Sequence, residues 1–319
     1  MIDTEPTTAS ARDDGLYTLI LGTRPSQLAR WQTDFVATAL RAAWNGVRTE
    51  IKVYTTQGDR ELTRPLPEIG GKGLFTAEIE AALHDGEIDM AVHSFKDLPI
   101  AESEWLTIGA TLERADAHDV LVSRHGLPLE ALPAGSRIGT SSPRRAAQIL
   151  AARPDARIVP LRGNVDTRLR KAATKDYDAV VLAAAGLTRL GLEEHITQHL
   201  PFDVMLPAPA QGALAVQCRR DAGAYALLRR IHHSPTWAAV SAERAFLSGL
   251  GGGCAAPVGA YAEVAGGVLR LRGLVASLDG RQVVSVAGEG TPDEPERLGH
   301  QLARQALDGG ARDLVEAKS

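Results

Sequence analysis

The chain has 319 residues, 44% of them hydrophobic and 23% charged, which is typical of a folded globular protein and excludes wholesale disorder. The net charge of −4 argues against a nucleic-acid partner. No run reaches the ~18 apolar residues of a membrane helix, so we expect no membrane contact. Cys218 and Cys254 are the only cysteines, which excludes a disulfide framework and predicts a reducing, cytoplasmic location.

Residues 1–15 are acidic and polar, and they predict a flexible tail rather than a secretory signal. From residue 17 to 206, short β-rich runs alternate with helical stretches. The expected strands are 17–23, 50–56, 88–94, 136–140, 156–161 and 177–186. The expected helices are 26–44, 74–86, 142–154 and 165–175, and the section 95–135 is left unassigned. This alternation predicts α/β layers with parallel strands.

Beyond Ala210 the pattern changes to that of a small α+β region. We expect strands at 212–219, 257–264, 268–277 and 282–290, and helices at 221–233, 234–250 and 294–307. The predicted domains are residues 16–112 with 212–233, residues 117–206, and residues 234–319. Segments 112–118 and 206–212 are expected to act as hinges.

Two turns repeat a similar pattern. Gly22-Thr23 and Gly139-Thr140 each end a predicted strand, and polar residues, a proline and then Ala follow. The repeat suggests two similar lobes, each directing a helix N-terminus, which can bind anions, at a shared cleft. The alternative is a pair of ordinary strand-to-helix turns.

Common catalytic motifs are missing from the sequence. Gly70–Gly73 lacks the spacing of a phosphate loop, and Gly251–Gly253 follows a helix rather than a strand. Neither a Gly-x-Ser-x-Gly elbow nor a His-Glu-x-x-His zinc motif occurs. His84 and His93 are interpreted as structural, and we expect no metal.

Arginine use is unusual, with 29 arginines against six lysines. A GC-rich genome would favour arginine codons, but arginine also binds planar anions such as carboxylates with a bidentate fork. Several arginines recur at the same end of the predicted strands, which codon bias alone does not explain: Arg24, Arg144, Arg145, Arg162, Arg168 and Arg189. Their positions favour a polycarboxylate ligand.

Two further strings carry reactive groups. Ser94, Lys96 and Asp97 follow a predicted strand, the end at which α/β proteins bind ligands, although a solvated charge cluster is the alternative. Cys254 lies between glycines and Pro257, which predicts an accessible thiol on a tight loop that can serve as an attachment point. Cys218 lies in an apolar strand and is predicted to be a core residue.

These strings together resemble the porphobilinogen deaminase (hydroxymethylbilane synthase) family, from about Leu19 to Ala262. The motifs that carry the resemblance are Arg24-x-Ser26-x-Leu28-Ala29-x-x-Gln32, GGKGLF, HSFKDLP, GTSSPRRAAQI, LRGNVDTRL, GLTRLG, AQGALAV and GGCAAPVG. The sequence departs from the family at Gln57, in Thr-Gln-Gly-Asp where Thr-Arg-Gly-Asp is frequent, at Glu68, and at Pro25.

The resemblance implies a three-domain transferase whose first two domains are lobes like those of type-2 periplasmic binding proteins, flanking the cleft that holds the active site. It implies a dipyrromethane cofactor, one per chain, attached by a thioether to Cys254. Four porphobilinogen molecules are joined to it with loss of ammonia, and hydrolysis releases hydroxymethylbilane for tetrapyrrole (haem-type) biosynthesis.

The resemblance also assigns roles to residues. Asp97 is implied as the catalytic residue, and Arg24, Ser26 and Arg189 as substrate contacts. The implied cofactor contacts are Ser94, Lys96, Thr140, Ser142, Arg144, Arg145, Arg162 and Arg168. The implied protein is a cytoplasmic monomer whose product passes to uroporphyrinogen III synthase. The alternatives are a non-catalytic two-lobed anion-binding protein and an inactive relative of the enzyme.

Overall fold

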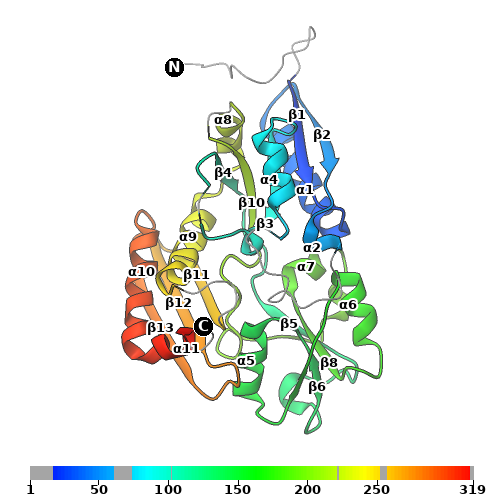
Figure 1. Ribbon diagram of the computed structural model, residues 1–319, viewed down its shortest axis with the longest axis vertical. Coiled ribbons are helices and arrows are strands. Elements are labelled where there is room, and N and C mark those ends of the chain that lie inside the picture. The colour runs from blue at the N-terminus through cyan, green and yellow to red at the C-terminus, as the bar shows by residue number, and fades with distance from the viewer. Residues whose placement is uncertain (1–16, 61–73, 102, 221–222, 252–256, 317–319) are drawn as a thin grey trace. The chain divides into compact units, whose positions relative to one another are not determined.

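The computed structural model describes residues 17–60, 74–101, 103–220, 223–251 and 257–316, which form two compact units (Figure 1). The first contains the described residues up to Arg114 together with Ala213–Ser234, and the second contains Ala115–Gly212 and the described residues from Pro235 onward. The chain passes between the units after Arg114 and after Gly212, at or beside the two predicted hinge segments, and a third time between Ser234 and Pro235. The predicted tail, 1–15, lies outside the described residues. The division into three domains stays a prediction, because the second unit combines two of them.

The first unit is built on a five-stranded sheet of order β2-β1-β3-β10-β4. Its strands are β1 (Tyr17–Thr23), β2 (Val47–Val53), β3 (Met90–Ser94), β4 (Leu106–Thr111) and β10 (Leu214–Arg219). β2, β1 and β3 run parallel, with Leu21 paired to both Ile51 and Met90. β10 is antiparallel to β3 and to β4.

Helix α1 (Gln27–Ala43) follows β1 because Ser26 caps it: the Ser26 Oγ accepts from the Ala29 N–H at 3.2 Å. Its apolar face, including Val36 and Leu40, packs on the sheet in one core. The unit also contains α2 (Gln57–Arg60), α4 (Ala77–His84), α8 (Ala224–Leu228) and the 3₁₀ turns η1 (Phe95–Asp97) and η4 (Arg229–Ile231).

The second unit repeats this architecture, with a sheet of order β7-β6-β8-β5-β9. Its strands are β5 (Asp119–Ser123), β6 (Arg137–Gly139), β7 (Arg157–Val159), β8 (Ala179–Ala183) and β9 (Gln198–His199). β7, β6 and β8 are parallel, and β5 is antiparallel to both β8 and β9, just as β10 is antiparallel to β3 and β4 in the first sheet. β6 therefore occupies the place of β1, which confirms the two similar lobes predicted from the repeated Gly-Thr turn.

The helices of this lobe are α5 (Pro143–Ala152), α6 (Val165–Ala172) and α7 (Ala184–Thr188), with 3₁₀ turns η2 (Leu129–Ala131) and η3 (Glu193–His195). Ser142 caps α5 and Asn164 caps α6 through their side-chain oxygens. Among the described residues, no helix is both long and apolar enough to cross a membrane.

The C-terminal region has its own antiparallel sheet of β11 (Val258–Ala265), β12 (Val268–Ala276) and β13 (Val283–Gly290). Helices α9 (Ser234–Gly249) and α10 (Pro295–Ala306) share a hydrophobic core with this sheet, and Phe246 is fully buried in it. The chain continues through η5 (Leu307–Ala311) to α11 (Arg312–Glu316). The predicted small α+β region is confirmed.

Several expectations differ from the structure; the predicted strand 177–186, for example, ends at Ala183, directly before α7. The sheets are mixed rather than purely parallel, because β10 in the first sheet and β5 in the second run antiparallel to both of their neighbours. β4 and β5 also fall in the section left unassigned. The second strand begins at Val47 rather than at Glu50, and Val47 pairs with Tyr17.

Glu243 of α9 ties the C-terminal region to the segment that returns to the first unit. Its side chain is fully buried; Oε2 accepts from the Ala210 N–H and Oε1 from the Ala262 N–H, both at 2.6 Å. Ala210 has a φ of 64°, a left-handed conformation that strains a residue with a Cβ. The carboxyl group thus links the strained backbone at Ala210 to strand β11 through two hydrogen bonds.

Glu243→Gln should lower the free energy of unfolding by about 2 kcal/mol. The amide has only one acceptor oxygen, so one of the two buried N–H groups would face a donor. Urea unfolding measures the change, with Glu263→Gln on the exposed side of β11 as the control. Equal stability of the two variants would contradict the role of Glu243.

Candidate active site

Three predicted site residues lie at the end of β3. Ser94 is the last residue of the strand, and Lys96 and Asp97 belong to the turn η1. Phe95 is buried beneath the turn, whereas Asp97 is exposed. The Ser94 Oγ accepts a hydrogen bond from Gln32 Nε2 of α1 at 2.9 Å. The turn therefore presents the Asp97 carboxylate from a well-anchored strand end.

A pocket joins this strand end to the β1–α1 turn. Arg24 and Ser26 line it from the turn, and Ser94 and Asp97 from the end of β3. The rest of its lining is Leu28, Ala29, Gln32, Phe75, Thr76, Val92 and His93. β1 and β3 are adjacent and parallel, so their carboxyl ends meet at one edge of the sheet. The structure thus brings four of the predicted residues together.

Arg24 already has an anionic partner in this pocket. Its Nη2 donates to Asp59 Oδ1 at 2.5 Å, and its guanidinium lies 4.3 Å from the centre of the Phe75 ring. Burial raises the pKa of Asp59, but the hydrogen bonds and charge of Arg24, together with donors from Thr56, outweigh burial and hold that pKa below its usual value. A substrate carboxylate at Arg24 would compete with Asp59.

Two buried polar atoms of pocket-lining residues have no hydrogen-bond partner among the described residues. They are His93 Nε2 and Thr76 Oγ1. Burial lowers the pKa of His93 to about 4, so the imidazole is neutral near pH 7. Unpartnered buried polar atoms are rare in native proteins, so these two suit a polar group of a ligand or a water.

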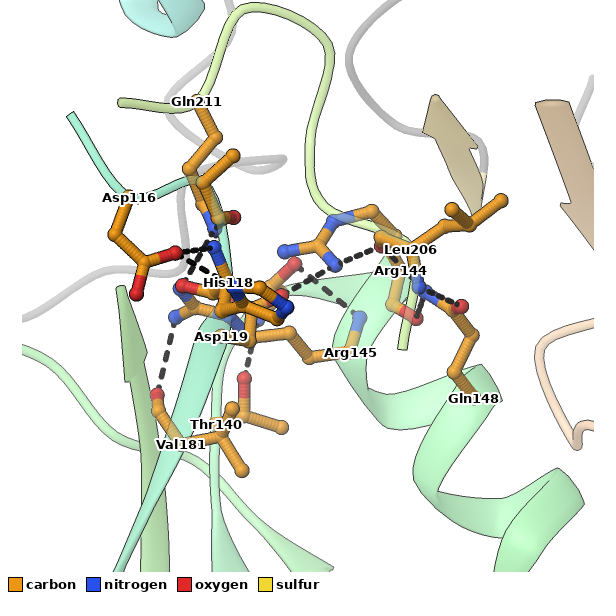
Figure 2. A network of polar contacts seen from close by, with 12 residues as sticks. Asp116, His118, Asp119, Thr140, Arg144, Arg145, Gln148, Val181, Leu206 and Gln211 are labelled. Atoms are coloured by element: carbon orange, nitrogen blue, oxygen red, sulfur yellow. Dashed lines mark hydrogen bonds and ion pairs between the residues drawn. The ribbon is translucent and has the colours of Figure 1, made fainter. Parts of the chain in front are cut away.

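In the second unit, Arg144 and Arg145 both point at one carboxylate, that of Asp119 at the start of β5 (Figure 2). Arg144 Nη1 donates to Asp119 Oδ2 at 2.7 Å, and Arg145 Nη2 donates to Oδ1 at 2.6 Å. Gln211 Nε2 adds a hydrogen bond to Oδ1 at 3.0 Å. Burial by itself would raise the pKa of Asp119, but the two arginines and Gln211 keep it well below its usual range.

The remaining predicted residues of this unit surround the same helix entrance and the next one. The Thr140 Oγ1 accepts from the Ser142 N–H at 3.1 Å, which shapes the turn before α5. Arg168 Nε donates to the Gly163 carbonyl at 2.7 Å, at the start of α6. Arg162 precedes this glycine, and its own carbonyl accepts from Lys171.

Arg189 contacts a different segment of the second unit. Its side chain is buried, and its Nη2 donates to the Gly212 carbonyl at 2.7 Å, where the chain returns to the first unit. Burial lowers the pKa of Arg189 to about 10. The contact supports the connecting segment, and its predicted role in substrate binding stays a prediction.

The structure describes only one of the two cysteines. Cys254 lies outside the described residues, so its predicted attachment role stays a prediction. Cys218 is fully buried in β10, and burial raises the pKa of its thiol to about 11, which confirms that it is a core residue. Among the described residues, no three His, Cys, Asp or Glu side chains could hold a metal ion.

The sequence does not indicate the partners of the arginines. Asp59, Gln211 and Phe75 lie in strings compared with the family, and Asp119 lies in the unassigned section 95–135, but no expectation pairs any of them with an arginine. Asp119 had a detectable signal, because it opens the apolar run Asp-Val-Leu-Val, where an ionised side chain needs a buried partner.

Comparison with known proteins identifies the family. Residues 19–226 match the family model described as "Porphobilinogen deaminase, dipyromethane cofactor binding domain", and residues 237–308 match "Porphobilinogen deaminase, C-terminal domain". The chain belongs to the porphobilinogen deaminase family. This membership confirms the resemblance seen in the sequence and does not favour the non-catalytic alternative.

Curated porphobilinogen deaminases are similar over nearly the whole chain. The enzyme of Syntrophomonas wolfei is 50% identical over 302 residues, covering 94% of this chain and 99% of its own length. That of Geobacillus kaustophilus is 49% identical over 300 residues, covering 93% and 96%.

The chain is also similar to solved structures at low sequence identity. The BvgS VFT2 domain of Bordetella pertussis is 17% identical and aligns with a TM-score of 0.40 over 67% of this chain and 86% of its own. The methionine-binding protein MetQ is 10% identical, with a TM-score of 0.41 over 67% and 88%.

The buried imidazole of His93 should make stability depend on pH. The unfolded chain binds a proton on His93 near pH 6.5, whereas the folded chain does so only near pH 4. Stability is therefore lost as the pH falls between these values, by about 1 kcal/mol per pH unit. Urea unfolding of His93→Gln from pH 6.5 to 4.5 should lack this component of the slope.

His84→Gln serves as the control, because it removes an exposed imidazole from α4 of the same unit. It should keep the slope of the unmodified chain. An identical slope in His93→Gln would contradict the protonation of His93 on unfolding.

Proposed function

We propose that this chain joins four porphobilinogen molecules head to tail, with loss of ammonia, into the linear tetrapyrrole hydroxymethylbilane. The observation that carries this proposal is the pocket in which Asp97 and Arg24 lie on adjacent strand ends, in a chain of the porphobilinogen deaminase family. The enzyme acts in tetrapyrrole biosynthesis as a cytoplasmic monomer and passes its product to uroporphyrinogen III synthase.

Asp97 acts as the catalytic residue. When ammonia leaves porphobilinogen, the C–N electron pair departs with nitrogen, and the positive charge that remains spreads onto the pyrrole ring. A carboxylate at ~4 Å stabilises this charge by about 4 kcal/mol at an effective dielectric constant near 20, which corresponds to roughly a thousandfold in rate. Asp97 is exposed at the turn η1, so its oxygens can also exchange a proton with the reacting groups.

The substrate's acetate and propionate carboxylates account for the arginines. In the pocket, Arg24 binds one carboxylate in place of Asp59, and Ser26 donates a further hydrogen bond. Arg189 contributes the third substrate contact. The unpartnered atoms of Thr76 and His93 lie in the same pocket wall and complete the polar lining.

The residues of the second unit fit a polyanionic cofactor. Two buried guanidiniums share one carboxylate, so the cluster has positive charge left for an anion. Arg144, Arg145, Arg162, Arg168, Thr140 and Ser142 would hold carboxylates of dipyrromethane, with Ser94 and Lys96 from the first unit. When bound through a thioether to Cys254, the cofactor supplies the pyrrole to which the first substrate unit is joined.

Asp97→Asn should reduce turnover at least about a hundredfold, because it removes the charge while keeping the size of the side chain. Product formation from porphobilinogen measures the loss, and intact mass shows whether the cofactor is present. Asp85→Asn, an exposed carboxylate of the same unit outside the pocket, should keep full activity. Near-normal turnover in Asp97→Asn would contradict the catalytic role of Asp97.

Cys254→Ser should abolish the covalent cofactor, because a hydroxyl is a far poorer nucleophile than a thiolate near neutral pH. The measured mass of the protein without substitutions should exceed the mass calculated from its sequence by two porphobilinogen units less two ammonia molecules. Dithiothreitol should not remove this excess. Cys218→Ala should keep it, since Cys218 is buried in the core. A chain without the excess mass, made in a host with active tetrapyrrole synthesis, would overturn the cofactor assignment.

A further inference from the structure

A single carboxylate divides its two oxygens between neighbouring arginines. Asp119 Oδ2 accepts from Arg144 at 2.7 Å, whereas Oδ1 accepts from Arg145 Nη2 at 2.6 Å and Nε at 2.9 Å (Figure 2). We propose that Asp119 is the positioning residue of the cofactor site: it aims Arg144 at a carboxylate of dipyrromethane, with Arg145 as its own counter-charge. This inference rests on the function proposed above.

The two arginines are used unequally by the chain. Every nitrogen of the Arg145 guanidinium has an acceptor, since Nε and Nη2 donate to Asp119 and Nη1 donates to the Val181 carbonyl at 3.0 Å. Arg144 uses only Nη1, which donates to Asp119 and to the Leu206 carbonyl at 2.6 Å. Among the described residues, its Nε and Nη2 have no acceptor. Arg144 is therefore the arginine with donors left for a ligand.

The cluster also needs an anion for electrostatic reasons. The side chains of Arg144, Arg145 and Asp119 are 6%, 8% and 0% exposed, and two guanidiniums face one carboxylate. A buried charge without a partner is strongly destabilising. Both arginines also lie in the first turn of α5, where the helix dipole adds positive potential. A ligand carboxylate at Arg144 would balance this surplus.

Asp119 can direct Arg144 because its own position is fixed. Gln211 Nε2 donates to Asp119 Oδ1 at 3.0 Å and to the Ala117 carbonyl at 2.9 Å, which ties the carboxylate to the segment returning from β9. Gln148 of α5 donates to the Leu206 carbonyl at 3.0 Å and accepts from the Leu206 N–H at 2.8 Å. Arg144 is thus held between two fixed acceptors.

The test compares two carboxylates that each hold two arginines in this unit. Asp119→Asn removes the proposed positioning charge, whereas Asp178→Asn breaks the pairs with Arg124 and Arg137 elsewhere in the lobe. Asp119→Glu keeps the charge of the cluster but lengthens the side chain by one methylene, which displaces its oxygens from Arg144, and it serves if Asp119→Asn does not fold. Full-length chains are purified from a host with active tetrapyrrole synthesis. Intact mass gives the fraction carrying the cofactor, and circular dichroism gives the folded fraction.

We expect the unmodified chain and Asp178→Asn to carry the cofactor in nearly every molecule. Folded Asp119→Asn and Asp119→Glu should carry it at least about tenfold less often, because an Arg144 that is no longer held in position loses its charge-assisted hydrogen bonds to the cofactor. Full cofactor content in either Asp119 variant would overturn the proposal. An equal loss of cofactor in Asp178→Asn would also overturn it, because cofactor content would then follow the stability of the fold rather than the position of Arg144. Absence of the cofactor from the unmodified chain would instead overturn the proposed function.

Discussion

An ionised carboxylate can be buried only when charges and hydrogen bonds replace the water it loses, and Asp119 meets this condition through residues from two other segments. Arg144 and Arg145 come from α5, and Gln211 comes from the segment returning to the first unit. Arg145 also reaches the carbonyl of Val181 in β8. The need to compensate one charge therefore fixes α5, β5, β8 and the returning segment relative to one another within the second unit.

The same strand order in both sheets explains where the site residues lie. In each unit three parallel strands end at one edge of the sheet, and the turns after β1, β3, β6 and β7 carry most of the predicted site residues. The antiparallel strands β5 and β10 fill the fourth place in each sheet. Each lobe thus gathers the residues predicted to bind anions at its strand ends.

Local pattern was sufficient for much of this arrangement. The strand over residues 17–23, the Ser26 and Ser142 helix starts and the C-terminal α+β region follow from alternation, capping and turn residues. The gathering of Arg24 with Asp97 follows from adjacent parallel strands. The pairing of Arg24 with Asp59 does not, because the two residues are 35 positions apart and nothing local to either indicates the other.

The sequence by itself determined the chemistry available to this protein: the arginines for carboxylates, the carboxylate at Asp97 and the motifs of the family. Only the tertiary structure decided how those groups are used. Arg144 and Arg145 are adjacent and identical in kind, yet within the described part of the chain Arg144 keeps donors without an acceptor and Arg145 does not, because Asp119 and nearby carbonyls accept from them unequally. Such a division depends on desolvation and distance between segments remote in sequence, which local patterns do not encode.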